Sequence, residues 1–462
     1  MASKFGGYAG KVIHIDLTTE TVKEYSWTDC QRQLYLGGKI MANRILADHL
    51  TGTETAFSEE NWVILSTGPL TGTGAPGSIR FDITALSPKS GLPTSSNCGG
   101  SFGLYLKKAG YDALILSGRC RIHRWLEIFE DRIRFHDADN LWGKGTTECR
   151  QLLTGLLNYN SYGSLCIGPA GEEWIPSAAV ISDDRAAGRA GLGAVLGWKN
   201  LKAITVTGSK PIPIYHQNKA QKEIKKWFIA LNTHPFTSGK EKVNSCVGCP
   251  IRCKTPGTEA NAILNDLGID SIAAAEGIQW LEERIGFKPE SNPKHRGGQR
   301  RKEIYPAMLK AFGLQESLNT AMLYQDLTEA VSASGLCMFT ANGCCPPFLI
   351  ANPNSIAAKM THTVIPHLGW LIHFVNRHPA VLFFQLSHTR ILRSTTGMKT
   401  NLGDFLKIGK RSSDLEQYLN CEFNGKPKLP KHLRGIEPDA YYKARGWDEN
   451  GVPPIFSCQA NE

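Results

Sequence analysis

The residues from Leu65 to Pro76 have the sequence Leu-Ser-Thr-Gly-Pro-Leu-Thr-Gly-Thr-Gly-Ala-Pro, in which a β-rich run passes directly into a loop of small residues. Few bulky side chains cover the main-chain amides of such a loop, so the amides can face an anion. It is not a Walker loop, because no Gly-Lys-Ser/Thr follows. The stretch therefore predicts strands joined by turns whose backbone closely approaches another group.

Two further glycine-rich segments repeat this theme. They run from Thr94 to Leu104 and from Arg185 to Gly191, and each carries polar side chains. Taken singly, each is more often a tight turn than a site. Together with Arg80 they place arginine beside exposed backbone, a combination that suits the phosphate oxygens of a large cofactor.

Outward from these loops, residues 8–208 alternate short β-rich runs with Gly, Pro and Ser turns, which predicts one β-rich domain. Beyond residue 211, apolar residues recur at helical spacing in residues 218–230, 259–281 and 307–331. The predicted fold class is therefore α+β, a β-rich N-terminal base followed by mainly α-helical domains. The predicted domains are residues 1–210, 211–340 and 341–462.

Composition excludes several classes of protein. Hydrophobic residues at 41% and charged residues at 20% of the 462 positions are ordinary globular values, which argues against disorder and a fibrous fold. The net charge of +10 favours anionic partners, but no nucleic-acid-binding signature accompanies it. The longest apolar stretch, residues 368–384, is too interrupted for a membrane span. Thirteen cysteines without a secretory signal predict a cytoplasmic protein in a reducing compartment.

The most specific motif is a cysteine run with C-x2-C-x3-C spacing, formed by Cys246, Cys249 and Cys253. Three thiols this close together can bind one metal centre, and Cys337 is the best distant fourth ligand. A [4Fe-4S] cluster is favoured, because zinc sites usually contain two C-x2-C pairs. Zinc held by four cysteines and unliganded buried thiols are the alternatives.

A dinucleotide-binding turn is a competing interpretation of residues 191–197. Their spacing is G-x-G-x-x-x-G, and no acidic partner for a ribose follows at the expected distance. This interpretation is therefore the weaker one.

The residues resemble those of the tungsten-containing aldehyde:ferredoxin oxidoreductases, with near-continuous coverage from Tyr8 to Cys253. The matching segments are GPLTG at 68–72, SNCGG at 96–100, GPAGE at 168–172, RAAGR at 185–189, GWKNLKAI at 197–204 and the cysteine run. The resemblance implies a tungsten (or molybdenum) bis-pterin centre beside a [4Fe-4S] cluster. It also implies a β-sheet base on which the pterins lie.

The resemblance implies site residues as well. The residues that would hold the pterin phosphates and a bridging Mg²⁺ are Arg80, Asn97, Gly99, Arg185, Ala186 and Gly188. The cluster ligands would be Cys246, Cys249, Cys253 and Cys337, and Met338 follows at a position that lines the pterin in the family. Two further segments are similar to the family's pterin-binding motifs: Asn265 to Asp270, and Ser332 to Cys337.

The second half departs from the family pattern. Asn265 and Ser332 stand where the family has Asp, so both would make weaker hydrogen bonds to pterin N–H groups. The family's Gly-Gly-Cys-His segment, whose His is proposed to move protons, has no counterpart between Cys253 and Cys337. No catalytic residue is therefore assigned.

The resulting hypothesis is an oxidoreductase that oxidises small aldehydes to carboxylic acids and passes the electrons through the cluster to ferredoxin. The basic residues from Arg296 to Lys302 are expected to dock an acidic ferredoxin, and neither nucleic acid nor membrane is an expected partner. The alternative is a non-catalytic iron-sulfur or electron-transfer protein of the same family.

Overall fold

The first part of the chain folds into two six-stranded sheets. The structure is a computed structural model. It describes residues 3–159, 161–232, 259–269, 283, 318–337, 387–423 and 437–454. The first sheet and its helices, here called the first unit, comprise β1 (Lys11–Asp16), β2 (Thr21–Tyr25), α1 (Asp29–Tyr35), α2 (Gly38–His49), β3 (Val63–Thr67), β4 (Phe81–Leu86), β5 (Pro93–Cys98), α3 (Phe102–Ala109) and β6 (Tyr111–Ser117). The second unit comprises β7 (Arg124–Phe129), β8 (Arg132–Asp137), α4 (Thr146–Leu156), β9 (Gly163–Ile167), α5 (Pro169–Glu172), β10 (Val180–Ser182), β11 (Arg185–Ala187), α6 (Leu192–Trp198) and β12 (Leu201–Thr207).

The two units share one topology. The first sheet has the strand order β2-β1-β6-β3-β4-β5, and the second, taken from its β8 edge, has the order β8-β7-β12-β9-β10-β11. In each sheet one central pair is parallel, β1 with β6 and β7 with β12, and the other pairs are antiparallel. The predicted β-rich base is therefore an internal duplication.

One hydrophobic core lies between the two sheets, and further hydrophobic clusters lie on their outer faces. Helices α3 and α6 contribute Phe102, Leu106 and Leu192 to a core that also contains inward residues of both sheets. Helix α2 packs on the outer face of the first sheet, and α4 packs on the outer face of the second. Strand β6 is buried at every position because both of its faces are covered.

Local signals fix the helix ends. Helix α1 starts at a capping box formed by Thr28 and Gln31, and α17 (Leu402–Glu422) starts at another formed by Asn401 and Asp404. Helix α3 ends at Gly110, whose φ of 106° is a left-handed conformation that favours glycine.

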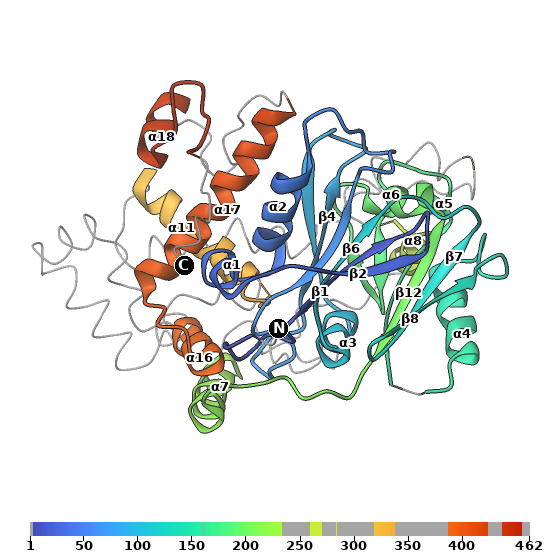
Figure 1. The fold of residues 1–462 in the computed structure, drawn as a ribbon, viewed down its shortest axis with the longest axis horizontal. Coiled ribbons are helices and arrows are strands. Elements are labelled where there is room, and N and C mark those ends of the chain that lie inside the picture. Colours follow the sequence, from blue (N-terminus) through green and yellow to red (C-terminus); the bar gives the residue numbers. More distant parts are fainter. Residues whose placement is uncertain are drawn as a thin grey trace, which may run out of the picture.

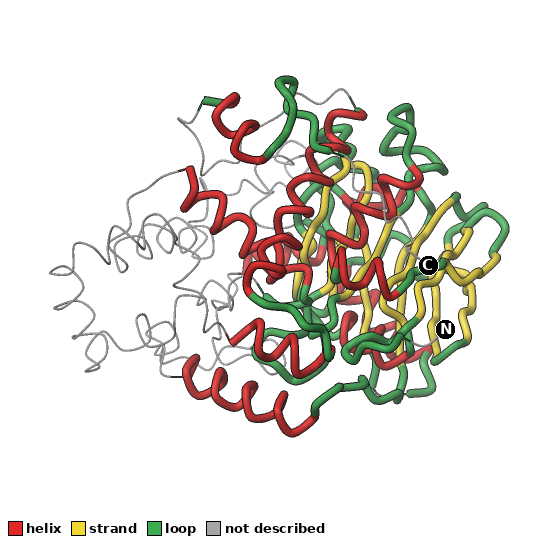
Figure 2. The backbone as a smooth tube through the Cα atoms, turned by 60° about the vertical axis from the view of Figure 1, so that its left-hand side comes forward, coloured by secondary structure: helices red, strands yellow, loops and turns green. Residues whose placement is uncertain are grey.

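The later helices lie beside this base. They are α7 (Gln217–Asn232), α8 (Glu259–Asp266), α11 (Leu318–Ala333), α16 (Ser387–Thr396), α17 and α18 (Pro438–Arg445). Helices α11 and α17 pack on each other and on α2, whereas α8 lies apart from them, beside α4 of the second unit (Figure 1). Figure 2 shows the strands gathered in one part of the molecule, with helices beside them.

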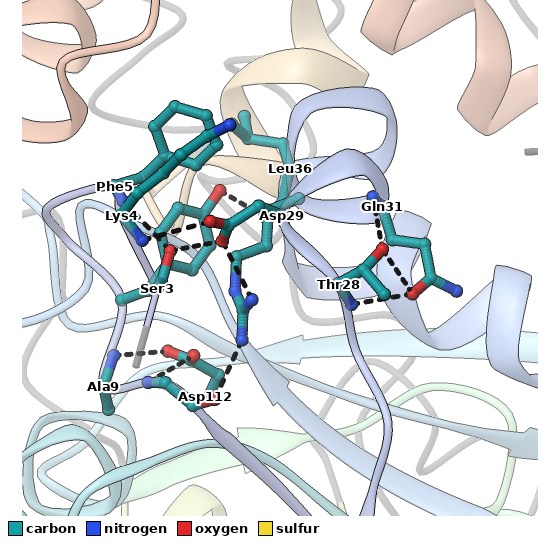
Figure 3. A network of polar contacts seen from close by, with 12 residues as sticks. Ser3, Lys4, Phe5, Ala9, Thr28, Asp29, Gln31, Leu36 and Asp112 are labelled. Atoms are coloured by element: carbon teal, nitrogen blue, oxygen red, sulfur yellow. Dashed lines mark hydrogen bonds and ion pairs between the residues drawn. The ribbon is translucent and has the colours of Figure 1, made fainter. Parts of the chain in front are cut away.

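The N-terminal segment donates hydrogen bonds to two carboxylates, those of Asp29 and Asp112 (Figure 3). Asp29 accepts hydrogen bonds from the Ser3 hydroxyl at 2.7 Å and from the Lys4 amide at 3.1 Å. Asp112 accepts from the amides of Ala9 and Gly10, each at 2.8 Å. The segment before β1 is thus part of the base.

The structure confirms the α+β fold class, with two mixed sheets followed by helices. The predicted helix at residues 218–230 corresponds to α7. Helix α8 lies within the predicted stretch 259–281, and α11 overlaps the predicted stretch 307–331 and ends two residues beyond it. The domain limits at residues 210 and 340 stay a prediction. Within the described part of the chain, no helix combines the length and apolar character needed to cross a membrane.

Candidate functional site

A Gly-Pro turn follows the same strand in each unit. Gly68 and Pro69 follow β3, and Gly168 and Pro169 follow β9. Each turn receives a segment from the helical part of the chain. The Leu70 amide donates to the Ser334 carbonyl at 2.8 Å, and the Ala170 amide donates to the Leu267 carbonyl at 3.0 Å.

Glycine permits these contacts on both sides. A Cβ atom on Gly68 would overlap the backbone of Ser334 and Gly335, and a Cβ on Gly168 would overlap the backbone of Leu267 and Gly268. Gly335 and Gly268 themselves have φ values of +87° and +80°. The two segments predicted as pterin-binding motifs therefore dock at corresponding places, one on each unit.

The two residues that depart from the family motif lie in these docked segments. The Asn265 main-chain oxygen accepts a hydrogen bond from Thr146 Oγ1 at 3.0 Å, which places Asn265 beside the start of α4. Ser332 is 2% exposed at the end of α11, and its carbonyl accepts from the Gly335 amide at 2.9 Å.

Cys337 is held directly against the first unit. Its amide donates to the Gly77 carbonyl at 2.9 Å, and Arg80 Nη2 lies 2.9 Å from Cys337 Sγ, which it contacts as a donor. The side chain is 5% exposed. The structure thus joins the predicted fourth cluster ligand to a predicted pterin-binding arginine.

The other predicted phosphate-binding residues meet where the two sheets adjoin. Strand β5 of the first unit lies against β11 of the second, and Cys98 Sγ is 3.7 Å from the Arg185 carbonyl. The Arg189 amide donates to Ser96 Oγ at 3.1 Å. This contact line, here called the seam, brings Asn97 of β5 and Arg185 of β11 into one region.

The glycine-rich loop after β5 is anchored at the seam by Asp183, in the turn between β10 and β11. Asp183 accepts hydrogen bonds from the Ser101 amide at 2.6 Å and from the Ser101 hydroxyl at 3.1 Å. A Cβ on Gly100 would lie 2.5 Å from Ser182 Oγ, so only glycine allows this approach. Gly99 and Gly188, both buried, lie in the two loops joined at the seam.

A group of charged residues beside β5, formed by Asp82, Lys39, Glu329 and Glu416, is not predicted from the sequence. Asn97 Nδ2 donates to Asp82 Oδ1 at 3.0 Å. Burial raises the pKa of Asp82 to about 6, although the hydrogen bond from Asn97 and the charge of Lys39 oppose that shift. Lys39 Nζ lies 2.5 Å from Glu329 Oε2 and 2.6 Å from Glu416 Oε1.

The sequence signal for this group is the alternation of apolar and polar residues along β4. Apolar residues at 81, 83 and 85 face the core between the sheets, which puts Asp82 and Thr84 on the opposite face. Alternation could have shown that Asp82 faces away from the core, but not that Asn97 lies opposite it.

Five of the predicted site residues lie outside the described residues. They are Cys246, Cys249, Cys253, Asp270 and Met338. Within the described ranges, no group of three or more His, Cys, Asp or Glu residues is placed to hold a metal ion. The four-cysteine cluster site therefore stays a prediction, of which the structure describes Cys337.

The glycines of the competing dinucleotide interpretation contact the protein's own backbone. A Cβ on Gly193 would overlap the Ala179 carbonyl, and a Cβ on Gly197 would overlap the Gly171 carbonyl. These glycines let α6 pack closely against neighbouring segments, so the geometry favours a structural role for residues 191–197.

Comparisons with known proteins agree with this arrangement. Residues 12–208 match the family "Aldehyde ferredoxin oxidoreductase, N-terminal domain", and residues 292–457 match "Aldehyde ferredoxin oxidoreductase, domains 2 & 3". The tungsten-containing aldehyde ferredoxin oxidoreductases of Pyrococcus furiosus and Thermococcus kodakarensis are each 36% identical over 234 residues. These matches cover 50% of this chain and 39% of either relative.

Two further similarities are more distant. The WOR-like subunit of an aliphatic sulfonate oxidoreductase from Pyrococcus furiosus is 34% identical over 230 residues, which are 46% of this chain and 36% of that protein. A solved structure, the active site complex BamBC of benzoyl coenzyme A reductase in complex with 1,5-dienoyl-CoA, aligns with a TM-score of 0.67 and 18% identity. It covers 97% of this chain and 96% of its own, and this likeness shows the fold alone.

Matches to both domain families and the 36% identical relatives support one conclusion. The chain belongs to the aldehyde ferredoxin oxidoreductase family.

Proposed function

We propose that the protein is an oxidoreductase that converts aldehydes to carboxylic acids at a tungsten (or molybdenum) bis-pterin centre. Electrons would leave through a [4Fe-4S] cluster to ferredoxin, and we assign the activity to the cytoplasm. The observation that carries the proposal is the contact between Arg80 Nη2 and Cys337 Sγ at 2.9 Å. It links the sheet base, which would hold the pterins, to a residue that would hold the cluster.

The described residues fit such a cofactor in part. Arg80 and Arg185 are half-buried at or near the seam, where their guanidinium groups would bind phosphate oxygens. The loop after β5 approaches Ser182 closely at Gly100, where a Cβ atom would lie 2.5 Å from Ser182 Oγ. Asn97, Gly99, Ala186 and Gly188 would complete this pterin- and Mg²⁺-binding set, as the family resemblance implies.

Cys337 fits a cluster ligand on chemical grounds. Its side chain is 5% exposed, and its sulfur accepts a hydrogen bond from the cationic Arg80. Hydrogen bonds to the sulfurs and exclusion of water also tune the potential of an iron-sulfur cluster. Cys246, Cys249 and Cys253 would supply the other three ligands.

The protein's own contribution would be binding, orientation and exclusion of water. The bound tungsten or molybdenum pterin would supply the two-electron chemistry. In the second docked segment, Ser332 offers a neutral hydroxyl in place of the family's carboxylate, so fewer charge-assisted bonds would hold a pterin there. No residue is assigned to proton transfer.

Anaerobic turnover tests the proposal. Purified protein is mixed with a panel of small aldehydes and either ferredoxin or a small redox dye, and carboxylic acid and reduced acceptor are quantified. Aldehyde-dependent reduction of both acceptors is expected. In Cys337→Ser, ferredoxin reduction should fall at least about 100-fold, because a cluster ligand is lost. Iron-containing protein that oxidises no aldehyde would contradict the proposal.

A second function is favoured by one observation. The Gly-Gly-Cys-His segment of the family is missing between Cys253 and Cys337. A non-catalytic iron-sulfur or electron-transfer protein would not need that segment. Such a protein would exchange electrons with a redox dye but would oxidise no aldehyde.

A further inference from the structure

Two buried cysteines of the second unit contact each other between α4 and β9. Cys149 lies near the start of α4 and Cys166 lies in β9, and both side chains are 0% exposed. They belong to the hydrophobic cluster between this helix and the outer face of the second sheet. Their thiols are hydrogen-bond partners of each other, and both are free thiols in the structure.

The surroundings make the two thiols chemically different. The hydrogen bond from Cys166 lowers the pKa of Cys149 against the effect of burial, and the charge of Lys202 lowers it further. The same hydrogen bond and burial raise the pKa of Cys166. Cys149 is therefore the more readily ionised thiol, and it is the thiolate that attacks an oxidant.

Helix α4 covers the pair on its solvent side. Leu152 and Leu156 of this helix are 39% and 59% exposed, so α4 lies at the surface of the molecule. Local opening of a surface helix transiently exposes the groups beneath it, on a scale that admits a small molecule. A small oxidant can therefore reach the two sulfurs without global unfolding.

The pair also joins the two elements that hold the second docked segment. Thr146 Oγ1 of α4 donates to the Asn265 carbonyl at 3.0 Å, and Cys166 Sγ lies 3.8 Å from the Thr146 carbonyl oxygen. Strand β9 leads to Gly168, which lies against the backbone of Leu267. A covalent bond between the two sulfurs would tie both anchoring elements together.

We propose that Cys149 and Cys166 form a redox-active dithiol, which a hydroperoxide oxidises to a disulfide that ties α4 to β9. The inference goes beyond the proposed function and does not depend on it.

The reaction balances with hydrogen peroxide as the oxidant. The Cys149 thiolate attacks one peroxide oxygen, so an S–O bond forms, the O–O bond breaks, and the departing hydroxide takes up the proton that Cys149 lost. The Cys166 sulfur then attacks the Cys149 sulfur, so an S–S bond forms, the S–O bond breaks, and water leaves with the Cys166 proton. The two thiols together lose two electrons, and one peroxide is reduced to two water molecules.

Peptide mapping tests the inference on the intact protein. Anaerobically purified wild type is treated with hydrogen peroxide and a chelator of released iron, then alkylated in denaturant and digested with trypsin. Cleavage after Lys144, Arg150 and Arg185 places the two cysteines in separate peptides, 145–150 and 151–185. A disulfide-linked pair of these peptides is expected, and treatment of the oxidised protein with dithiothreitol before alkylation should remove it.

Hydrogen exchange measures the tie between the two elements. The amides of α4 should exchange at least about 10-fold more slowly in the oxidised than in the reduced protein, because the disulfide constrains the opened state. Cys166→Ser removes one sulfur at nearly constant size, so the linked peptides and the slower exchange should both disappear. Cys120→Ser is the matched control and should keep both, since it removes another buried thiol, whose pKa burial raises to about 12.

Three results would overturn the inference. They are Cys149 and Cys166 that both remain alkylated after peroxide treatment, cysteines that end as sulfinic acids or link to other cysteines, and unchanged exchange of α4 in linked protein. The wild-type map decides even if Cys166→Ser does not fold.

Discussion

The two units of the base have the same strand order, yet they carry different chemistry. Each has a Gly-Pro turn that receives a glycine-containing segment, and each has a helix packed on the outer face of its sheet. The first unit adds Asp82, Asn97 and a contact to Cys337, whereas the second has Ile181 and Ala186 in its hairpin. The duplicated backbone supplies two docking places, one on each unit. Individual side chains then decide what each docking place can bind.

Each unit contains a buried lysine, and removing each of them compares how much the two units lose in free energy of unfolding. Lys107 bonds Asp112 and the Gly7 carbonyl, and Lys202 bonds Glu172 and the Lys144 carbonyl, with both lysine side chains fully buried. Lys202→Met should reduce the free energy of unfolding by about 4 kcal/mol, since the buried Glu172 loses its cationic partner and keeps the Gly143 amide as a donor. Lys107→Met should have a somewhat smaller effect, because Asp112 keeps two amide donors. Chemical denaturation measures both.

The matched control for this prediction also removes the carboxylate of Glu172, which Lys202→Met leaves without its lysine partner. Lys202→Met combined with Glu172→Leu should regain much of the lost stability, because no unpaired charge remains. A double variant no more stable than Lys202→Met would show that packing, and not charge, dominates at this position.

The two Gly-Pro turns give the next largest effect. Gly68→Ala and Gly168→Ala should each reduce the free energy of unfolding by about 3 kcal/mol, because the new methyl group would overlap docked backbone. Gly155→Ala is the control, since Gly155 lies exposed in α4 with nothing within 4 Å of a Cβ. This change should be neutral or slightly stabilising. If chemical denaturation shows a large loss of unfolding free energy for only one of Gly68→Ala and Gly168→Ala, the two docking places are not equivalent.

Asp82 makes the first unit sensitive to pH. Burial raises its pKa from an ordinary 3.8 to about 6, so the folded protein holds this proton more tightly than the unfolded chain. The contribution of Asp82 to the free energy of unfolding should therefore fall by about 2 to 3 kcal/mol as the pH rises from 4 to 6, and stay constant above.

Comparison of wild type with Asp82→Asn isolates this contribution. The stability of the variant relative to wild type should increase between pH 4 and 6, as followed by urea denaturation at each pH. A control change to a buried polar residue of the second unit, Ser182→Ala, should give a difference that does not depend on pH. A pH-independent difference for Asp82→Asn would contradict the raised pKa.

The sequence was informative where a signal is local. Turn residues such as Gly68 and Pro69, and the β-rich runs that became β3, β6 and β12, predicted the β-rich base and its loops. Arg80, Asn97 and Arg185 were predicted as site residues from the family resemblance, and the structure brings Asn97 and Arg185 to one seam and Arg80 to Cys337.

The remainder depends on contacts between distant residues. The duplication was not apparent, because the units share strand order and the Gly-Pro turns but differ in loop lengths and in α5. The pairing of Lys39 with Glu329 and Glu416 joins three helices across 377 residues, which no local pattern encodes. Asp82 escaped notice because a single polar residue in a strand usually faces solvent.

Cofactor content tests the central claim most directly. Tungsten, molybdenum, iron and released pterin are quantified per chain in anaerobically purified protein. The account predicts about one tungsten or molybdenum with about two pterins and about four iron atoms, the content of a bis-pterin centre beside one cubane cluster. Iron without tungsten, molybdenum or pterin would contradict it and leave an iron-sulfur protein of the same family.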